Sequence, residues 1–243
     1  MSINEAAKSE GDPWWKTAFG AHYESLYAHR DDASAVAEVA GLLPRLRQVP
    51  GPILDACCGN GRHLAALRAA GLPAFGFDLS ADLLRSANHR SQCRERMVRC
   101  DMRTPAVSGG WGAVLVLFTA FGYFDDKTNA TCLATFAQLL VPGGLLVLDL
   151  PNPQAIKQKL IPRSERMTPD GHVVEERTIG QGRVEKTVTL SRDDASFNRI
   201  VKASACMNAV KSRYQLIEQS CRWSRCGRVF AAQTAMSNAA FIG

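Results

Sequence analysis

Three acidic residues of the chain, Asp55, Asp78 and Asp101, each stand where a short apolar run ends. Between the first two lies a turn of small residues, in which Gly59 and Gly61 let the backbone bend sharply and approach a ligand closely. A strand, a glycine turn, a helix and a second strand that ends in an acid form the first half of a nucleotide-type binding site. A carboxylate suits the end of the second strand because it accepts hydrogen bonds from both hydroxyls of a ribose.

Two kinds of cofactor match such a turn. A dinucleotide site has the pattern G-x-G-x-x-G/A, and here Gly59 and Gly61 supply the first two positions while Leu64 occupies the third. Asp55 precedes the turn, and its carboxylate is poorly placed beside a pyrophosphate. The same carboxylate attracts a cation, such as the α-amino group or the sulfonium of S-adenosylmethionine. The electrostatics therefore favour S-adenosylmethionine over NAD.

The chain around these acids alternates apolar, strand-like runs with helix-like segments. This alternation predicts a doubly wound, mostly parallel α/β sheet with right-handed crossovers, which is a Rossmann-like fold. Ser80 is expected to cap the helix after Asp78, and Asp125-Asp126 the helix after the fourth strand. The expected strands are 53–56, 74–77, 97–100, 111–118 and 145–150, and the expected helices are 62–70, 81–91 and 128–140, with a turn at 141–144.

An aromatic stripe precedes this core, between residues 13 and 46. Its members recur at spacings of three and four, which predicts helix. They are Trp14, Trp15, Phe19, Tyr23, Leu26 and Tyr27. The stripe fits either a helix face packed on the core or a lid over the cofactor, and the two interpretations are compatible. Asp32 is expected to cap a second helix, which Pro50-Gly51-Pro52 ends.

The alternation of strand-like and helix-like segments ends after Pro151. Extended runs at 171–177 and 183–191 flank Gly180-Gln181-Gly182, which predicts a β-hairpin. From residue 199 onward no period is clear. We therefore expect four parts: an N-terminal helical lid or cap (1–52), an S-adenosylmethionine-binding core (53–153), a β-hairpin insertion after strand five that forms a substrate wall (154–198), and an atypical basic tail (199–243).

Composition restricts the partners of the chain. It has 243 residues, 46% of them hydrophobic, which suffices for one α/β domain. Residues 199–243 contain seven Lys and Arg against the single acid Glu218, whereas residues 1–150 contain 14 basic and 15 acidic residues. Because the basic excess lies outside the cofactor core, a nucleic-acid partner is not expected. The tail is either a divergent end with its own partner or the product of a frame shift near residues 197–202.

The sequence shows neither a targeting signal nor a metal-binding pattern. No apolar run is long enough to cross a membrane, and residues 1–5 lack the basic-then-apolar pattern of a signal peptide. The eight cysteines are scattered and form no C-x-x-C pair. The sequence therefore predicts a cytoplasmic protein with reduced cysteines, no metal site and no membrane partner. It gives no indication of oligomeric state.

Five motifs, in order along residues 14–153, resemble those of class I S-adenosylmethionine-dependent methyltransferases of the bacterial small-molecule type. The motifs are LDACCGNGRH (54–63), GFDLS (76–80), CDMR (100–103), FTAFGYFDD (118–126) and LVPGG (140–144). One departure is Cys57, where many members have the first glycine of the turn. The resemblance implies a Rossmann-like methyltransferase fold, S-adenosylmethionine as cofactor and a small-molecule methyl acceptor.

The resemblance also implies roles for individual residues. Asp55 and the turn 57–61 would surround the methionine part of the cofactor, and Asp78 would accept the ribose hydroxyls. Asp101 would accept the adenine amino group, with Met102 against the ring. The full cofactor-binding set that it implies is Asp55, Cys57, Gly59, Asn60, Gly61, Asp78, Leu79, Asp101, Met102 and Phe118.

Methyl transfer is an in-line displacement at a carbon activated by a positive sulfur, so the protein mainly aligns the reactants and excludes water. Phe118 would line the channel for this step. A general base is required only if the acceptor loses a proton during attack. Tyr123 and His22 are candidates, beside Asp125 and His63, and no sequence partner assigns the role. The acceptor atom stays open between nitrogen, oxygen and carbon. The alternative function is a catalytically weak or inactive S-adenosylmethionine- or RNA-binding protein with a basic tail.

Overall fold

The computed structural model describes residues 13–20, 22–150, 152–192, 198–206 and 226–232. Within them, the five strands of the predicted core and β10 form a six-stranded sheet of order β10-β5-β4-β1-β2-β3, in which all neighbouring pairs are parallel. The strands are β1 (Ile53–Ala56), β2 (Ala74–Asp78), β3 (Met97–Arg99), β4 (Trp111–Val116), β5 (Leu140–Asp149) and β10 (Cys226–Ala232). This is the order of a doubly wound sheet, so the predicted fold class is confirmed.

Helices cover both faces of the parallel sheet, because its central strands are apolar on both sides. The helices around it are α3 (Asp32–Leu46), α4 (Arg62–Ala69), α5 (Ala81–Asn88) and α6 (Asp126–Leu139). Ile53 and Leu54, neighbours on β1, are both fully buried but belong to two separate apolar clusters. Phe136 of α6 joins the cluster of Leu54, whereas Leu46 of α3 and Leu64 of α4 join the cluster of Ile53. Burial on both faces is typical of a parallel strand.

The helix caps follow the sequence with one correction. Ser80 caps α5 and Asp125 caps α6, each through a side-chain oxygen that accepts a backbone N–H. The cap of α3 is Asp31 and not the predicted Asp32: the Asp31 carboxylate accepts a hydrogen bond from the Ser34 N–H at 2.8 Å. Asp31 has the extended backbone that an N-cap requires, and Asp32 is already helical.

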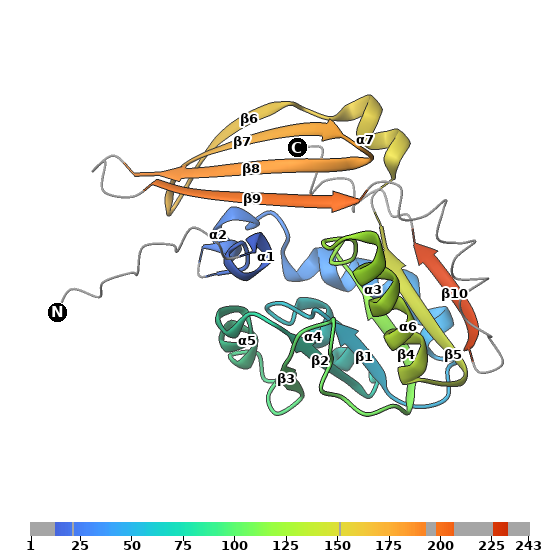
Figure 1. Cartoon of the computed structure of the whole chain (residues 1–243). Helices are drawn as coiled ribbons and strands as arrows, with labels where there is room; N and C mark the ends of the chain where they lie inside the picture. Colours follow the sequence, from blue (N-terminus) through green and yellow to red (C-terminus); the bar gives the residue numbers. More distant parts are fainter. Residues whose placement is uncertain (1–12, 21, 151, 193–197, 207–225, 233–243) are drawn as a thin grey trace.

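A second sheet has four antiparallel strands in the order β6-β7-β8-β9. Figure 1 shows α1 and α2 between this sheet and the parallel one. The elements of this part are α1 (Trp14–Thr17), α2 (Tyr23–Leu26), α7 (Pro153–Lys159), β6 (Arg163–Thr168), β7 (Gly171–Gly180), β8 (Arg183–Ser191) and β9 (Asn198–Cys206). The predicted hairpin is β7 and β8. Its tip, Gln181-Gly182, has the positive φ angles (48° and 73°) of a two-residue hairpin turn.

Several elements differ from the prediction. The hairpin is the centre of a larger sheet, and β9 crosses the expected boundary at residue 198. β9 and β10 also lie where no element was expected. The expected turn at 141–144 is instead the irregular start of β5, where the register with β4 shifts between Trp111 and Ala113 and Gly143 has a φ of 79°. β6 was missed because its residues are mostly polar and about half of them are exposed.

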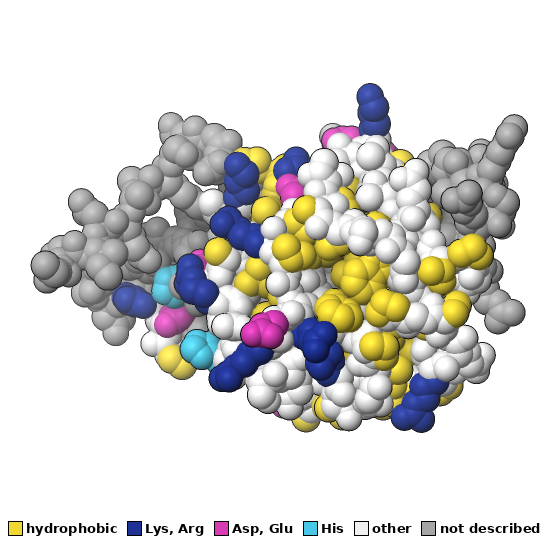
Figure 2. All heavy atoms as spheres, turned by 90° about the horizontal axis from the view of Figure 1, so that it is seen from below, with side chains coloured by type: hydrophobic (Ala, Val, Ile, Leu, Met, Phe, Trp, Pro, Cys, Tyr) yellow, Lys and Arg dark blue, Asp and Glu magenta, His cyan; other side chains and the backbone are white. Residues whose placement is uncertain are grey.

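None of the helices among the described residues has the length and apolarity needed to span a membrane. Cys57, Cys58, Cys93, Cys100 and Cys132 are free thiols, and the described part of the chain contains no group of three His, Cys, Asp or Glu side chains able to hold a metal ion. On the face seen in Figure 2, the Lys and Arg side chains of the described residues are interspersed with acidic and His side chains.

Candidate functional site

A cavity of about 820 Å³, its open mouth included, lies where the carboxyl ends of the parallel strands meet. Nine of the ten predicted cofactor-binding residues line it: Asp55, Cys57, Gly59, Asn60, Asp78, Leu79, Asp101, Met102 and Phe118. Trp15, Phe19 and Tyr23 of the N-terminal segment line it as well. The aromatic stripe therefore packs on the core and also covers the cavity, as both sequence interpretations expected.

Gly61 is the predicted residue that the structure does not bring to the cavity wall. Its φ is 76°, a left-handed conformation that favours glycine. A Cβ at this position would lie 2.8 Å from the Sγ of Cys93 and 3.1 Å from the Cβ of Ala87. Gly61 is therefore needed for close packing behind the turn, and it shapes the cavity indirectly.

Asp78 is prepared to accept a further hydrogen bond. Its Oδ2 accepts the Gly59 N–H and its Oδ1 accepts the Ser80 N–H, each at 2.8 Å. Burial raises the pKa of Asp78, and the backbone N–H donors oppose that rise. The Leu79 N–H is a third backbone donor to this carboxylate, which faces the cavity and has about four acceptor positions, so it retains capacity for a ribose hydroxyl.

Asp55 carries the clearest mark of a cationic ligand. The residue is 2% exposed, and its Oδ2 has no hydrogen-bond partner among the residues that the structure describes. Burial raises the pKa of Asp55 to about 6, opposed by the positive charges of His63 and Arg62. A buried carboxylate oxygen without a partner is costly, and a positively charged donor in the cavity relieves that cost. The unpaired carboxylate oxygen of Asp55 thus fits the positively charged α-amino group of S-adenosylmethionine.

Asp101 is held by an arginine that the sequence analysis left without a role. The guanidinium of Arg103 contacts both Asp101 oxygens, with Nη2 2.6 Å from Oδ2 and Nε 3.0 Å from Oδ1. These hydrogen bonds lower the pKa of Asp101 and keep it charged. The guanidinium also lies over the rings of Phe124 and Trp15, at 5.1 and 5.5 Å from their centroids. Arg103 therefore connects the third strand end to the N-terminal segment.

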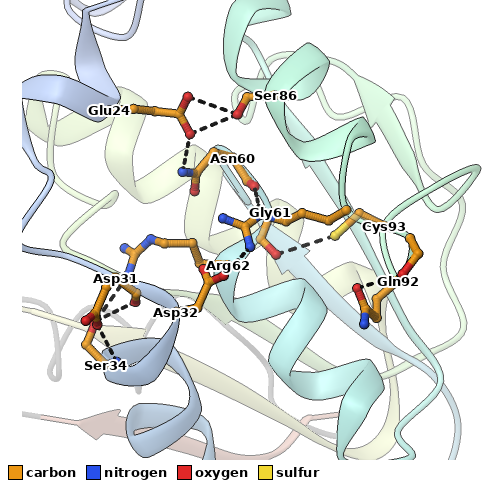
Figure 3. Close-up of polar contacts among 12 residues, drawn as sticks. Glu24, Asp31, Asp32, Ser34, Asn60, Gly61, Arg62, Ser86, Gln92 and Cys93 are labelled. Carbon is orange, nitrogen blue, oxygen red and sulfur yellow. Dashed lines mark hydrogen bonds and ion pairs between the residues drawn. The ribbon is translucent and has the colours of Figure 1, made fainter.

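Polar contacts tie the N-terminal segment to the cofactor turn (Figure 3). The carboxylate of Glu24 accepts hydrogen bonds from Asn60 Nδ2 at 2.6 Å and from Ser86 Oγ at 2.8 Å. Arg62 Nη1 donates to the Asp31 carbonyl at 3.0 Å. These bonds join α2 and the start of α3 to the turn and to α5, so the cavity wall formed by the aromatic stripe is held in place.

The four candidate bases lie in different surroundings. Tyr123 lines the cavity, where its ring stacks on Phe19, and burial raises its pKa well above the usual value. His22 lies outside the cavity, with Nδ1 3.0 Å from the Asp170 carboxylate. Asp125 serves as the cap of α6. His63 lines the cavity, but its Nε2 is 2.5 Å from the carboxylate of Glu38.

Glu38 was not found from the sequence. It lies on α3, where its carboxylate bonds His63 and lies 3.3 Å from Arg30 Nη2. Neither local pattern nor spacing links residues 38 and 63, because the contact forms only when α3 packs on α4. Arg62 and Arg103, in contrast, belong to the motifs LDACCGNGRH and CDMR. Their positions close to Asp55 and Asp101 in the sequence could have indicated that they lie beside these acids.

Comparisons with known proteins agree with this geometry. A family model described as "Methyltransferase domain" matches residues 53–144. A dTDP-3-amino-3,6-dideoxy-alpha-D-glucopyranose N,N-dimethyltransferase of Streptomyces fradiae is 28% identical over 121 residues, which are 49% of this chain and 47% of that protein. A glycine/sarcosine N-methyltransferase of Halorhodospira halochloris is 34% identical over 106 residues, 41% of this chain and 40% of that protein. The matches thus span less than half the length of these curated relatives.

Solved structures share the fold over more of the chain. The amino pentose methyltransferase CalS10 of Micromonospora echinaspora, solved with bound S-adenosylmethionine, superposes with a TM-score of 0.61 at 23% identity, covering 82% of this chain and 87% of that one. DesVI of Streptomyces venezuelae gives a TM-score of 0.61 at 22% identity, with the same coverage.

The fold and the three acids at its strand ends define a nucleotide-type cofactor domain of the doubly wound α/β class. With the family match, residues 53–144 form a methyltransferase domain of the class I S-adenosylmethionine-dependent kind. The predicted family and cofactor are thereby confirmed, whereas the NAD and RNA-binding alternatives find no support among the matches described above. The roles assigned to single residues stay predictions.

Proposed function

We propose that this chain transfers a methyl group from S-adenosylmethionine to the nitrogen of a small-molecule amine. The observation that carries the proposal is that both curated relatives are named N-methyltransferases, and the state of the two phenols that line the cavity, Tyr23 and Tyr123, is consistent with it. Burial raises the pKa of both hydroxyls, so neither accepts a proton at neutral pH. An amine that enters as the free base attacks with its own lone pair, whereas a hydroxyl acceptor must lose a proton during attack.

The named activities of the relatives support nitrogen as the acceptor atom. Both curated relatives are N-methyltransferases, one acting on an amino sugar nucleotide and one on glycine and sarcosine. KedS8 of a Streptoalloteichus species, with a TM-score of 0.60, is described as a sugar N-methyltransferase. These acceptors differ widely in size and charge, so they support the acceptor atom and a small-molecule class without selecting one molecule.

In this proposal the residues of the cavity bind and orient, and the cofactor supplies an electrophilic methyl group on a positive sulfur. Asp55 holds the α-amino group, Asp78 the ribose hydroxyls and Asp101 the adenine amino group. Trp15 and Phe19 exclude water from the space between the cofactor and the acceptor. Alignment of nucleophile and methyl carbon then provides the main part of the rate increase.

The test is methyl transfer from labelled cofactor. The full chain is incubated with S-adenosylmethionine that carries a deuterated methyl group and with a library of small primary and secondary amines. The library includes glycine, sarcosine and dTDP-3-amino-3,6-dideoxy-α-D-glucopyranose, and each amine is paired with its hydroxyl analogue. We expect mass spectrometry to find the label on nitrogen in at least one amine and on no hydroxyl analogue. Label on oxygen alone, or on no member of the library, contradicts the proposal.

A further inference from the structure

An open groove of about 930 Å³ adjoins the cofactor cavity. Four residues line both spaces: Tyr23, Asn60, Arg62 and Phe118. A molecule bound in the groove therefore reaches the cofactor cavity past side chains that the two spaces share. The groove is the natural place to seek the residues that orient the second reactant.

Tyr27, which follows α2, stands in the wall of this groove. Its ring centroid lies 4.7 Å from that of Tyr23 and 6.0 Å from that of Phe118, edge-on to the latter. Both of these rings also line the cofactor cavity. The ring of Tyr27 is thus fixed beside the junction of the two spaces, and the side chain is half-buried.

A lysine that contacts Tyr27 determines whether the Tyr27 hydroxyl accepts or donates in their hydrogen bond. Nζ of Lys186 on β8 lies 2.6 Å from the phenol oxygen of Tyr27. An ammonium group has three donors and no acceptor, so the phenol oxygen must be the acceptor of this hydrogen bond. The hydroxyl proton of Tyr27 is consequently directed to another partner.

Lys186 occupies a position that packing alone would give to an apolar residue. Val184, Val188 and Leu190 alternate with it along the same face of β8, and all are at most 4% exposed. Lys186 itself is 3% exposed. A buried ammonium costs several kcal/mol unless it is paired. The ammonium group therefore needs a buried anion and a hydrogen-bond acceptor beside it.

The charge of Lys186 is compensated within the same sheet. Its Nζ is 3.6 Å from Oε1 of Glu175, a residue on β7 that is 3% exposed. The same carboxylate contacts Arg166 at 3.2 Å and also pairs with Arg177. One buried anion thus holds three cations, and Lys186 is the one of these three that bonds Tyr27.

We infer that the groove binds the methyl acceptor, and that Tyr27, oriented by Lys186, donates a hydrogen bond that positions the acceptor nitrogen toward the cofactor. The inference rests on the proposed function. The groove is lined by equal numbers of basic and acidic residues: Arg30, Arg62, Arg90, Glu24, Asp31 and Asp32. Recognition by net charge is therefore weak, and the acceptor class is an amine with an oxygen lone pair close to the nitrogen, which Tyr27 can contact.

The test compares two variants with a matched control. Tyr27→Phe removes the donor, Lys186→Met removes the group that orients it, and Glu185→Gln changes an exposed neighbour on β8. The substrate is the amine that the labelled-cofactor library identifies. We expect Tyr27→Phe to raise the acceptor KM about tenfold, the effect of one hydrogen bond, while the Kd of S-adenosylhomocysteine stays unchanged in calorimetry. Lys186→Met should act in the same direction, and Glu185→Gln should not.

An acceptor analogue separates positioning from a structural effect. The wild type should lose about the same factor in KM when the amine lacks its neighbouring oxygen, and Tyr27→Phe should then cause no further loss. Additive losses, or an unchanged KM in Tyr27→Phe, overturn the inference while the proposed function stands. If no amine is methylated by the wild type, the proposed function fails and the inference fails with it. Should Lys186→Met not fold, Tyr27→Phe decides alone, because it removes a single oxygen atom.

Discussion

The parallel sheet and the antiparallel sheet place their buried charges in opposite ways. In the parallel sheet the acids that face the cavity stand at strand ends, as Asp55 and Asp78 do on β1 and β2. In the antiparallel sheet Glu175, Arg177 and Lys186 lie within β7 and β8, each at most 3% exposed. The first arrangement leaves carboxylate oxygens directed at a cavity, whereas the second pairs charges with one another inside the protein.

This difference separates two tasks. A carboxylate at a strand end receives backbone N–H donors from nearby turns, as Asp78 does from Gly59 in the turn after β1 and from Ser80 in the turn after β2. A charge in the middle of a strand must be balanced by its neighbours or it destabilises the fold. We therefore expect substitutions in the antiparallel sheet to reduce stability first, and substitutions at the strand ends of the parallel sheet to reduce cofactor affinity first.

The largest effect is expected for Glu175→Ala. This change removes the anion that Arg166, Arg177 and Lys186 share, and it leaves buried positive charges without a partner. Breaking such a network lowers the free energy of unfolding by about 3–5 kcal/mol, measured by denaturant titration. Glu176→Ala, the exposed neighbour on β7, is the control and should change stability by at most about 0.5 kcal/mol. Equal losses in both variants would contradict the contrast between the sheets.

Asp78→Ala should reduce the affinity for the cofactor more than it reduces stability. Loss of a hydrogen bond between a charged carboxylate and a ribose hydroxyl costs about 3 kcal/mol, so the Kd of S-adenosylhomocysteine should rise roughly 100-fold in calorimetry. The free energy of unfolding without ligand should fall by less, about 1–2 kcal/mol, because the Gly59 and Ser80 N–H groups lose their acceptor while the cost of burying a carboxylate is also removed. Asp82→Ala, on the partly exposed first turn of α5, is the matched control. An unchanged Kd in Asp78→Ala would remove the ribose role.

The same contrast explains what the sequence could predict of the fold. β1 and β4 were predicted because strands buried on both faces give continuous apolar runs, as in Ile53–Ala56 and Trp111–Val116. The caps Ser80 and Asp125 were predicted because capping is a local interaction. β6 was missed because its sequence, RSERMT, alternates exposed and half-buried residues without an apolar face.

The candidate site likewise contains residues that the sequence could predict and residues that it could not. The acids at strand ends could be predicted, because a parallel sheet necessarily brings the carboxyl ends of its strands to one edge. The pair Tyr27 and Lys186 could not, since 159 residues separate them and only the packing of β8 against α2 joins them. The contact of Glu38 with His63 was missed for the same reason. Topology therefore predicts the acids that line the cavity, whereas tertiary packing determines the contacts of Tyr27 and His63.

The pH dependence of stability should sharpen the comparison at Asp55. Burial raises its pKa to about 6, above the value of about 3.9 for an unfolded chain. The unfolded carboxyl therefore ionises first, so the stability that Asp55 contributes is full below about pH 4 and declines as the pH rises to about 6. The loss is on the order of 3 kcal/mol. Asp55→Asn should lack this decline. Unfolding curves of wild type and variant that run parallel from pH 4 to 7 would contradict the raised pKa.

The smallest effect is expected for a substitution at Glu24, which links the N-terminal segment to the parallel-sheet domain. Its carboxylate joins α2 to Asn60 in the cofactor turn and to Ser86 on α5, and the side chain is exposed (Figure 3). Glu24→Ala removes this connection without touching the cavity wall. Loss of about 1 kcal/mol should speed dissociation of S-adenosylhomocysteine roughly fivefold in stopped-flow measurements. Glu95→Ala, at another exposed glutamate, should leave the rate unchanged. An unchanged rate in Glu24→Ala would mean that the other contacts, among them the hydrogen bond from Arg62 to the Asp31 carbonyl, suffice to hold the N-terminal segment against the turn.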